Sequence, residues 1–257
     1  MALDGQNKHA SARFFRKNFK SRRIMGESFN FMKHAAIFDW DGVVVDSEYK
    51  HLLSWEMLAQ KHGLTLPPNF VIDTFGRRNL EIIKDMYNWV ETVEEAQAWS
   101  DEKEVYFRGI LREQGVDPIP GVIETMKAFH AAGIPMAVGS STPRENLVMQ
   151  ADMLGIAKMF AATVTMEDVK NGKPAPDVFL LGAERMGVTP ENCVVFEDSV
   201  AGIEAAFNAG MRRVAVATTH DVDFWEKRGA ENAEKRVDGI IKNFTGFGAP
   251  ELEKIFS

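Results

Sequence analysis

The strongest constraint on the fold lies after Pro118, where short apolar runs alternate with segments of helical spacing. Apolar runs of this length indicate buried strands, and helical connections between them join strands that run parallel. The runs are residues 136–139, 160–164, 193–196, 213–217 and 237–241. The alternation predicts an α/β fold, a Rossmann-like, doubly wound parallel sheet with helices on both faces. In such sheets a ligand binds at the carboxyl ends of the strands, near the point where the strand order reverses.

Residues 35–38 form a further short apolar run, which ends in two carboxylates, Asp39 and Asp41, followed by Gly42. An unpaired buried carboxylate is costly, so a pair at the end of a buried strand is expected to share a metal ion or a proton. The simpler alternative is a strand that ends in an Asp-Gly turn. These two carboxylates alone do not decide between the two interpretations.

Residues 48–116 contain no segment typical of a strand. Helical spacing is found instead, with Ser47 as the expected cap of the first helix, in segments 47–62, 69–75, 80–90 and 93–114. We therefore predict an all-helical cap domain at 48–116, inserted into a core domain made of residues 34–47 and 117–257.

Polar side chains also follow the later predicted strands. They are Ser140, Ser141 and Thr142 after one strand, Lys173 in the loop after the next, and Glu197 and Asp198 after a third. Ordinary structural explanations exist, with Thr142 as a helix cap and Lys173 as a solvated loop charge. Their shared position at one edge of the sheet instead predicts a ligand site.

This set of side chains suits phosphoryl transfer through a covalent aspartate. Asp39 is the expected nucleophile, which forms an aspartyl phosphate. Charge on the phosphoryl oxygens requires a hard cation, and Mg²⁺ held by Asp39 and Asp198 meets this need. The Lys173 ammonium and the Ser140 hydroxyl are the expected phosphate donors. Asp41 is expected to protonate the leaving oxygen and later to activate water.

Four stretches resemble the motifs of the haloacid dehalogenase superfamily, in the branch whose helical cap follows the first motif. In the family's order, over about residues 34–245, they are Asp39-Trp-Asp41-Gly42, Ser140 at a strand end, Lys173 in Gly-Lys-Pro-Ala-Pro, and Glu197-Asp198-Ser199. The resemblance implies that the Asp41 backbone carbonyl and Glu197 also support the metal ion. It implies phosphate binding by Ser140, Ser141 and Lys173.

Dehalogenases and phosphonatases that resemble this chain lack a carboxylic acid two residues after the nucleophile, so Asp41 implies chemistry on a phosphate ester. We expect a phosphatase of a small phosphorylated metabolite, such as a sugar phosphate. The alternative is a phosphosugar mutase, because His51, Gly76 and Arg108 resemble positions of beta-phosphoglucomutase. A third possibility is a binding or regulatory protein that keeps the pocket without catalysis.

Four residues of the helical segment are candidates for contacts with the substrate. They are His51, Arg77, Arg78 and Arg108. The ordinary alternative is a solvated helix start for Arg77 and Arg78, and a helix-surface position for His51.

The formal net charge of −7 is unevenly distributed, since residues 1–33 carry +6 and the remainder −13. An acidic body argues against nucleic acid as a main partner, because phosphate backbones are bound by Lys and Arg surfaces. No apolar run approaches the roughly 18 residues of a membrane-spanning helix. The basic segment has the composition of an organelle-targeting peptide, and the alternatives are a tail, an expression remnant, or a start at Met25 or Met32.

The chain has a single cysteine, Cys193, within an apolar run. One cysteine excludes an internal disulfide, and a buried thiol fits a reducing compartment. The buried thiol is consistent with a cytoplasmic location, which we expect unless the basic segment directs the chain to an organelle. We also expect a monomer.

Overall fold

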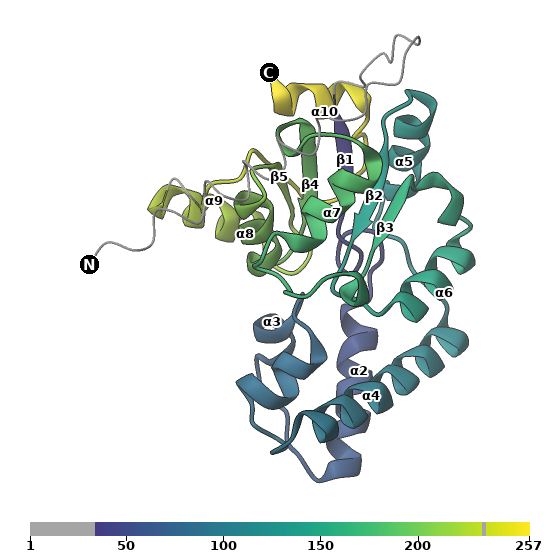
Figure 1. The fold of residues 1–257 in the computed structure, drawn as a ribbon, viewed down its shortest axis with the longest axis vertical. Helices are drawn as coiled ribbons and strands as arrows, with labels where there is room; N and C mark the ends of the chain where they lie inside the picture. The colour runs from purple at the N-terminus through teal and green to yellow at the C-terminus, as the bar shows by residue number, and fades with distance from the viewer. Residues whose placement is uncertain (1–33, 233–234) are drawn as a thin grey trace. The chain divides into compact units, whose positions relative to one another are not determined.

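The computed structural model describes residues 34–232 and 235–257. Within them, six strands form one parallel sheet in the order β3-β2-β1-β4-β5-β6 (Figure 1). The strands are β1 Ala35–Phe38, β2 Met136–Gly139, β3 Ala162–Val164, β4 Cys193–Glu197, β5 Arg212–Val216 and β6 Gly239–Ile241. The predicted α/β, doubly wound fold is confirmed. The basic segment 1–33, on which the targeting and start-site alternatives depend, lies outside the described residues.

The strand order reverses at β1. This strand pairs in parallel with β2 on one side and with β4 on the other. The chain builds outward through β2 and β3, then returns to β4 and builds in the opposite direction. Asp39 follows β1 and Glu197 ends β4, so carboxylates flank the reversal point. This is where a ligand is expected in such a sheet.

Helices cover both faces of the sheet. One face carries α5 Val122–Ala131, α6 Arg144–Leu154 and α10 Ala249–Phe256, and the other carries α7 Asp177–Met186, α8 Val200–Asn208 and α9 Val222–Glu231. Along β1, Ala36 and Phe38 belong to the core under the first group, whereas Ala35 and Ile37 belong to the core under α7 and α8. Because successive side chains of a strand point to opposite faces, one short buried strand contributes to two cores.

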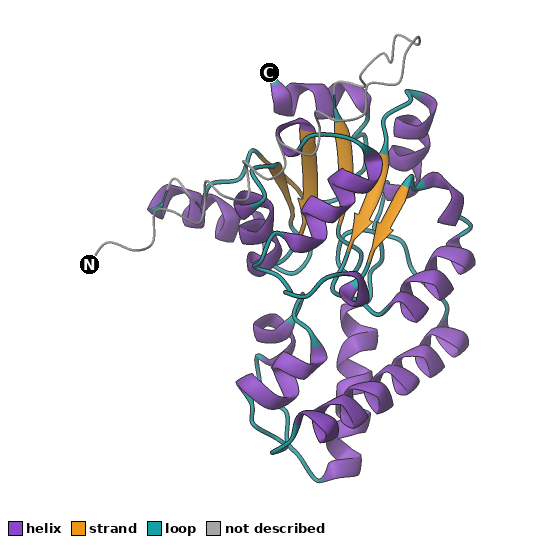
Figure 2. Cartoon of the chain, in the orientation of Figure 1, coloured by secondary structure: helices purple, strands orange, loops and turns teal. Residues whose placement is uncertain are grey.

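Residues 48–116, here called the helical insert, are all described and contain no strand. Their helices are α2 Glu48–His62, α3 Phe70–Thr74, the π-helix η2 Glu81–Met86 and α4 Val93–Gln114. The insert has its own hydrophobic cluster, which includes Trp55, Leu58 and Phe70. Figure 2 shows it at the end of the sheet toward which the strands point. The boundaries of the two predicted domains stay a prediction.

The observed helices differ from the predicted ones mainly at their caps and ends. Neither Ser47 nor Thr142 caps a helix with its side chain, and both hydroxyls donate to Asp41. The helix predicted at 80–90 ends at Met86, just before Asn88, whose φ of 48° cannot continue a right-handed helix.

The C-terminal helices α9 and α10 are absent from the prediction. Short helices of this kind depend on tertiary packing more than on local propensity. In α10, the Phe256 ring stacks on His34 with centroids 3.8 Å apart, and Glu253 accepts from the same imidazole at 2.9 Å. None of the described helices is long and apolar enough to cross a membrane.

Candidate active site

Asp39, Lys173 and Glu197 form a buried ionic cluster at the carboxyl end of the sheet. Lys173 Nζ donates to Asp39 Oδ1 at 2.7 Å and to Glu197 Oε1 at 2.6 Å. Burial raises the pKa of Asp39 to about 7, although Lys173 acts in the opposite direction. Burial acts to lower the pKa of Lys173, but the two carboxylates outweigh it and hold this pKa above its usual range. The predicted nucleophile therefore lies against a fixed positive charge.

Asp198 completes a group of oxygens that suits a divalent metal ion. Asp39, Glu197 and Asp198 each offer one carboxylate oxygen, and these atoms lie within 4.8 Å of one another. Asp198 Oδ1 is buried without a hydrogen-bond partner. Burial, followed by the neighbouring carboxylates, raises the pKa of Asp198 well above its ordinary value. An orphaned oxygen among buried carboxylates is stabilised by a hard cation, so these residues fit the predicted metal.

Two glycines make room for these carboxylates because they lack a Cβ. Gly42 has a φ of 76°, and a Cβ there would lie 2.0 Å from Asp198 Oδ2. At Gly202, a Cβ would lie 1.7 Å from Glu197 Oε1. Any side chain at either position would displace a metal-ligand candidate.

Asp41 lies two residues beyond Asp39, in a different environment. Its carboxylate accepts from Ser47 Oγ at 2.6 Å, from His51 Nε2 at 3.2 Å and from Thr142 Oγ1. Burial acts to raise the pKa of Asp41, but His51 and the two hydroxyls outweigh it and lower the value to about 2. The pKa values of these two aspartates, at the end of one strand, are thus shifted in opposite directions. This pattern is expected of carboxylates with different roles.

His51 is held in turn by Lys103, which the sequence analysis did not select. Lys103 Nζ lies 2.8 Å from His51 Nδ1 and 2.9 Å from Glu104 Oε1. An ammonium can only donate, so His51 Nδ1 accepts and its Nε2 carries the hydrogen that faces Asp41. Lys103 is 1% exposed on α4. A lysine on the apolar stripe of a predicted helix is the available signal, because lysine is rarely fully buried without a partner.

Several of these side chains line a cavity of about 60 Å³, whereas Lys173, Glu197 and Asp198 lie outside its lining. Of the predicted residues it contains Asp39, Asp41, His51, Arg77, Ser140 and Ser141, and of those the prediction missed, Trp55, Asn79, Lys103 and Glu104. Pockets for small ligands typically measure about 300–1,000 Å³. The helical insert is therefore closed over the site, and a substrate of sugar size requires it to move.

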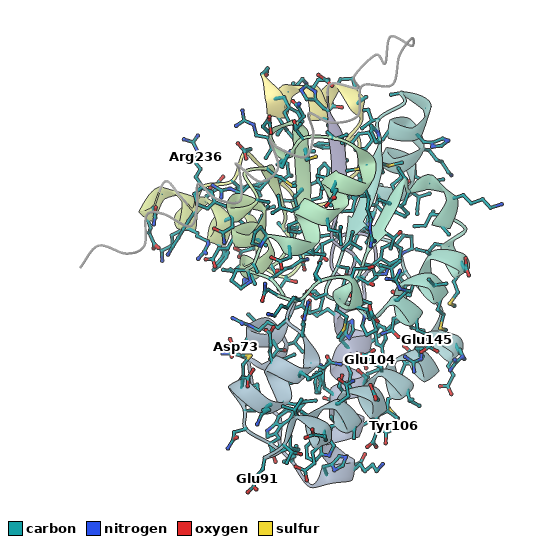
Figure 3. The ribbon with its side chains drawn as sticks, viewed as in Figure 1. Asp73, Glu91, Glu104, Tyr106, Glu145 and Arg236 are labelled. Atoms are coloured by element: carbon teal, nitrogen blue, oxygen red, sulfur yellow. The ribbon has the colours of Figure 1, made fainter. Side chains whose placement is uncertain are left out.

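Arg78 and Arg108 lie outside the lining of this cavity and contact the core instead. The Arg78 guanidinium binds backbone carbonyls of residues 166–170. Arg108 Nη1 donates to Asn146 Oδ1 on α6 at 3.0 Å. Figure 3 shows Glu104 of α4 near Glu145 of α6, where this second contact is made. Both guanidinium groups bind the core in this closed arrangement, so their predicted contacts with a substrate stay a prediction.

A model of the haloacid dehalogenase-like hydrolases matches residues 33–210. The chain belongs to this family of hydrolases. It is 37% identical to the fructose-1-phosphate phosphatase of Escherichia coli over 182 residues, which cover 70% of this chain and 94% of that protein. It is 34% identical over 208 residues to the chloroplastic 5-amino-6-(5-phospho-D-ribitylamino)uracil phosphatase of Arabidopsis thaliana. That match covers 80% of this chain but only 55% of the relative, so the chain spans about half of that protein's length.

Among solved structures of this hydrolase family, the chain resembles a beta-phosphoglucomutase from Clostridium difficile. The TM-score is 0.74 at 26% identity, with 88% of this chain and 97% of that chain covered. The predicted family, and the prediction of an enzyme that hydrolyses phosphate monoesters, are confirmed by these comparisons. The cytoplasmic location, the monomeric state and the exclusion of nucleic acid stay predictions.

Proposed function

We propose that this hydrolase is a Mg²⁺-dependent phosphatase of a small phosphorylated metabolite, a sugar phosphate or similar ester, and acts through an aspartyl-phosphate intermediate. The observation that carries the proposal is the pair of unlike carboxylates at the end of β1. Asp39 accepts a hydrogen bond from Lys173, and Asp41 accepts one from His51. Relatives named as phosphatases of phosphorylated carbohydrates and of fructose 1-phosphate support the substrate class.

In the first step an Asp39 oxygen attacks phosphorus, and the bond from phosphorus to the leaving oxygen breaks. Lys173 favours the ionised form of Asp39 and provides positive charge for the phosphoryl oxygens. Ser140 Oγ accepts from the Thr142 backbone N–H at 3.0 Å, which leaves the Ser140 hydrogen free for a phosphoryl oxygen. Mg²⁺, held by Asp39 and Asp198 with support from Glu197, would neutralise further phosphoryl charge.

Asp41 moves the proton in both steps. In the closed cavity its three donors favour the ionised form. A substrate phosphate brings negative charge into the same cavity, which favours the protonated carboxyl. Asp41 then gives this proton to the leaving oxygen, and as a carboxylate it takes one from the water that cleaves the aspartyl phosphate. Ester and water become alcohol and phosphate, and both aspartates are restored.

A phosphosugar mutase is the alternative, favoured by the structural likeness to beta-phosphoglucomutase. A mutase returns the phosphoryl group from the aspartate to another sugar hydroxyl, whereas a phosphatase transfers it to water. The two functions therefore differ in whether inorganic phosphate is released.

The test is a panel of sugar phosphates, nucleotides and glycerol phosphates, in which phosphate release and isomer formation are measured together. A phosphatase releases one phosphate per ester, requires Mg²⁺ and stops when EDTA is added. Asp39→Asn should lose turnover and keep its circular dichroism spectrum, with deamidation excluded by mass spectrometry. Isomer formation without phosphate release would identify a mutase. No turnover of any ester, a generic aryl phosphate included, would favour a binding or regulatory protein.

A further inference from the structure

Arg78 of the helical insert holds a backbone segment of the core that leads to Lys173. Its Nη1 donates to the carbonyl of Lys170 at 3.2 Å, and its Nη2 donates to those of Met166 at 3.4 Å and Val169 at 3.2 Å. These carbonyls lie between β3 and Lys173. We call residues 165–173 the lysine segment. One guanidinium thus binds three carbonyls of the segment, which suits the fixed fork of an arginine.

Close packing accompanies these hydrogen bonds. A Cβ on Gly172 would lie 2.9 Å from Arg78 Nε and 3.0 Å from Glu81 Oε1, so a side chain there would push these two groups aside. The turn that carries Arg78 also rests on the core through Gly76, where a Cβ would lie 2.7 Å from Ser199 Oγ. Arg78 therefore reaches the lysine segment only while this turn lies against the core.

The lysine segment is also held by the core itself. Asp168 accepts from Arg144 Nη2 at 2.6 Å and from Arg185 Nη2 at 2.7 Å. These donors belong to the core and remain when the insert moves. The contacts of Arg78 do not, because they join the insert to the core.

We infer that Arg78 is a positioning residue that couples closure of the helical insert to the placement of Lys173. With the insert closed, Arg78 fixes the carbonyls that lead to Lys173, whose Nζ then bridges Asp39 and Glu197. With the insert open, the lysine segment keeps its anchor at Asp168 and loses the one at Arg78. The Lys173 ammonium, the proposed phosphate-binding group, is then held in its full set of contacts only when the insert has closed over a substrate.

The kinetic consequence rests on the proposed phosphatase function, whereas the structural consequence does not. The test therefore uses two measurements on the full chain: hydrogen exchange of the peptide that spans 165–173, and kcat and KM for an aryl phosphate. The variants are Arg78→Ala and Arg78→Lys, where lysine keeps the charge but lacks the fork. The control is Lys84→Ala, because Lys84 Nζ also donates to a backbone carbonyl, that of Glu91 at 2.8 Å, but within the insert.

In Arg78→Ala, exchange of the 165–173 peptide should rise about tenfold or more, the scale expected for losing hydrogen bonds from a charged donor. The value of kcat should fall by a similar factor with a smaller change in KM, since a misplaced Lys173 affects the transition state more than binding. Arg78→Lys should lie between Arg78→Ala and wild type, and Lys84→Ala should match wild type in both measurements.

Unchanged exchange in the 165–173 peptide of both Arg78 variants would overturn the inference, whatever the kinetics show. Faster exchange across the whole chain in Arg78→Ala would indicate general loss of structure, and Arg78→Lys then decides the matter. If wild type turns over no ester, the proposed function fails, and the exchange data still test the coupling.

Discussion

His51 Nε2 lies 3.2 Å from Asp41 Oδ1, so a side chain of the helical insert hydrogen-bonds the proposed acid/base group of the core. The His51 ring stacks on Phe107, with centroids 4.0 Å apart, and Lys103 binds its other nitrogen. If the insert opens, Asp41 loses this hydrogen bond and keeps that of Ser47. The environment of Asp41 therefore depends on whether the insert is closed.

Asp41→Asn should lower kcat by about two to four powers of ten, the usual scale for losing general acid/base catalysis. Esters with good leaving groups should lose less in the first step, because their leaving oxygen needs no proton. The measurement is kcat for a series of aryl phosphates of graded leaving-group pKa. Asp46→Asn, which changes an exposed carboxylate on the same loop, is the control. Equal losses across the series would contradict the acid role and indicate that Asp41 only positions its neighbours.

Glu104 is a second buried carboxylate whose ionised form the fold stabilises. It accepts from Lys103 Nζ at 2.9 Å, from Asn79 Nδ2 at 2.7 Å and from Asn146 Nδ2. Burial acts to raise the pKa of Glu104, but Lys103 and the other donors outweigh it and lower this pKa below its ordinary 4.5. The ionised group therefore stabilises the folded state above about pH 4.5. This contribution is lost as the pH falls through the lowered pKa.

Lys103→Met should lower the free energy of unfolding by about 3–5 kcal/mol, because it leaves Glu104 as a buried charge without its cation. Adding Glu104→Gln to this variant should restore part of the loss, since the amide carries no charge. Denaturant unfolding of the two single variants and the double variant at pH 7 measures the coupling. If the loss of unfolding free energy in the double variant equals the sum of the losses in the two single variants, Lys103 and Glu104 do not stabilise one another.

The strand ends that carry the site were predictable because the information is local. An apolar run followed by Asp39, by Ser140 or by Glu197 can be recognised without knowing what lies beside it. The reversal of strand order at β1 then brings these ends together, and the general rule for open parallel sheets anticipates it.

Contacts between residues far apart in the sequence were not predictable in the same way. Lys103 was visible as a helical residue, but its partner His51 lies on another helix and meets it only after α2 and α4 pack. At Ser47 and Thr142 the local pattern pointed to helix caps. In the folded chain neither side chain caps a helix, and both hydroxyls instead lie against Asp41, whose buried carboxylate needs hydrogen-bond donors.

Cys193 should resist thiol reagents in the native protein. Burial, followed by the charge of Glu191, raises the pKa of the Cys193 thiol to about 12, so almost no thiolate is present at pH 8. Labelling with a chromogenic disulfide should be very slow in buffer and should give one thiol per chain in denaturant, since the sequence has a single cysteine. Rapid labelling in buffer would instead show that β4 opens locally and exposes the thiol.

Arg108→Ala should affect a sugar phosphate and a small aryl phosphate alike. Arg108 Nη1 donates to Asn146 Oδ1 at 3.0 Å and lies 3.3 Å from Glu145 Oε2, so the side chain ties α4 of the insert to α6 of the core. Losing a charge-assisted bond to the buried Asn146 should cost about 1–3 kcal/mol in the closed arrangement, which both substrates need. Arg112→Ala, an exposed position one turn further along α4, is the matched control.

The measurement for Arg108 is kcat/KM for both esters in the two variants and wild type. If Arg108 joins the insert to the core, kcat/KM should fall by a similar factor for both esters in Arg108→Ala. It should not fall in Arg112→Ala. A fall confined to the sugar phosphate would show that Arg108 leaves Asn146 and reaches the substrate, as the sequence predicted, because the aryl ester offers it no polar group beyond the phosphate. Wild-type values for both esters would show that the contact with Asn146 contributes nothing to closure.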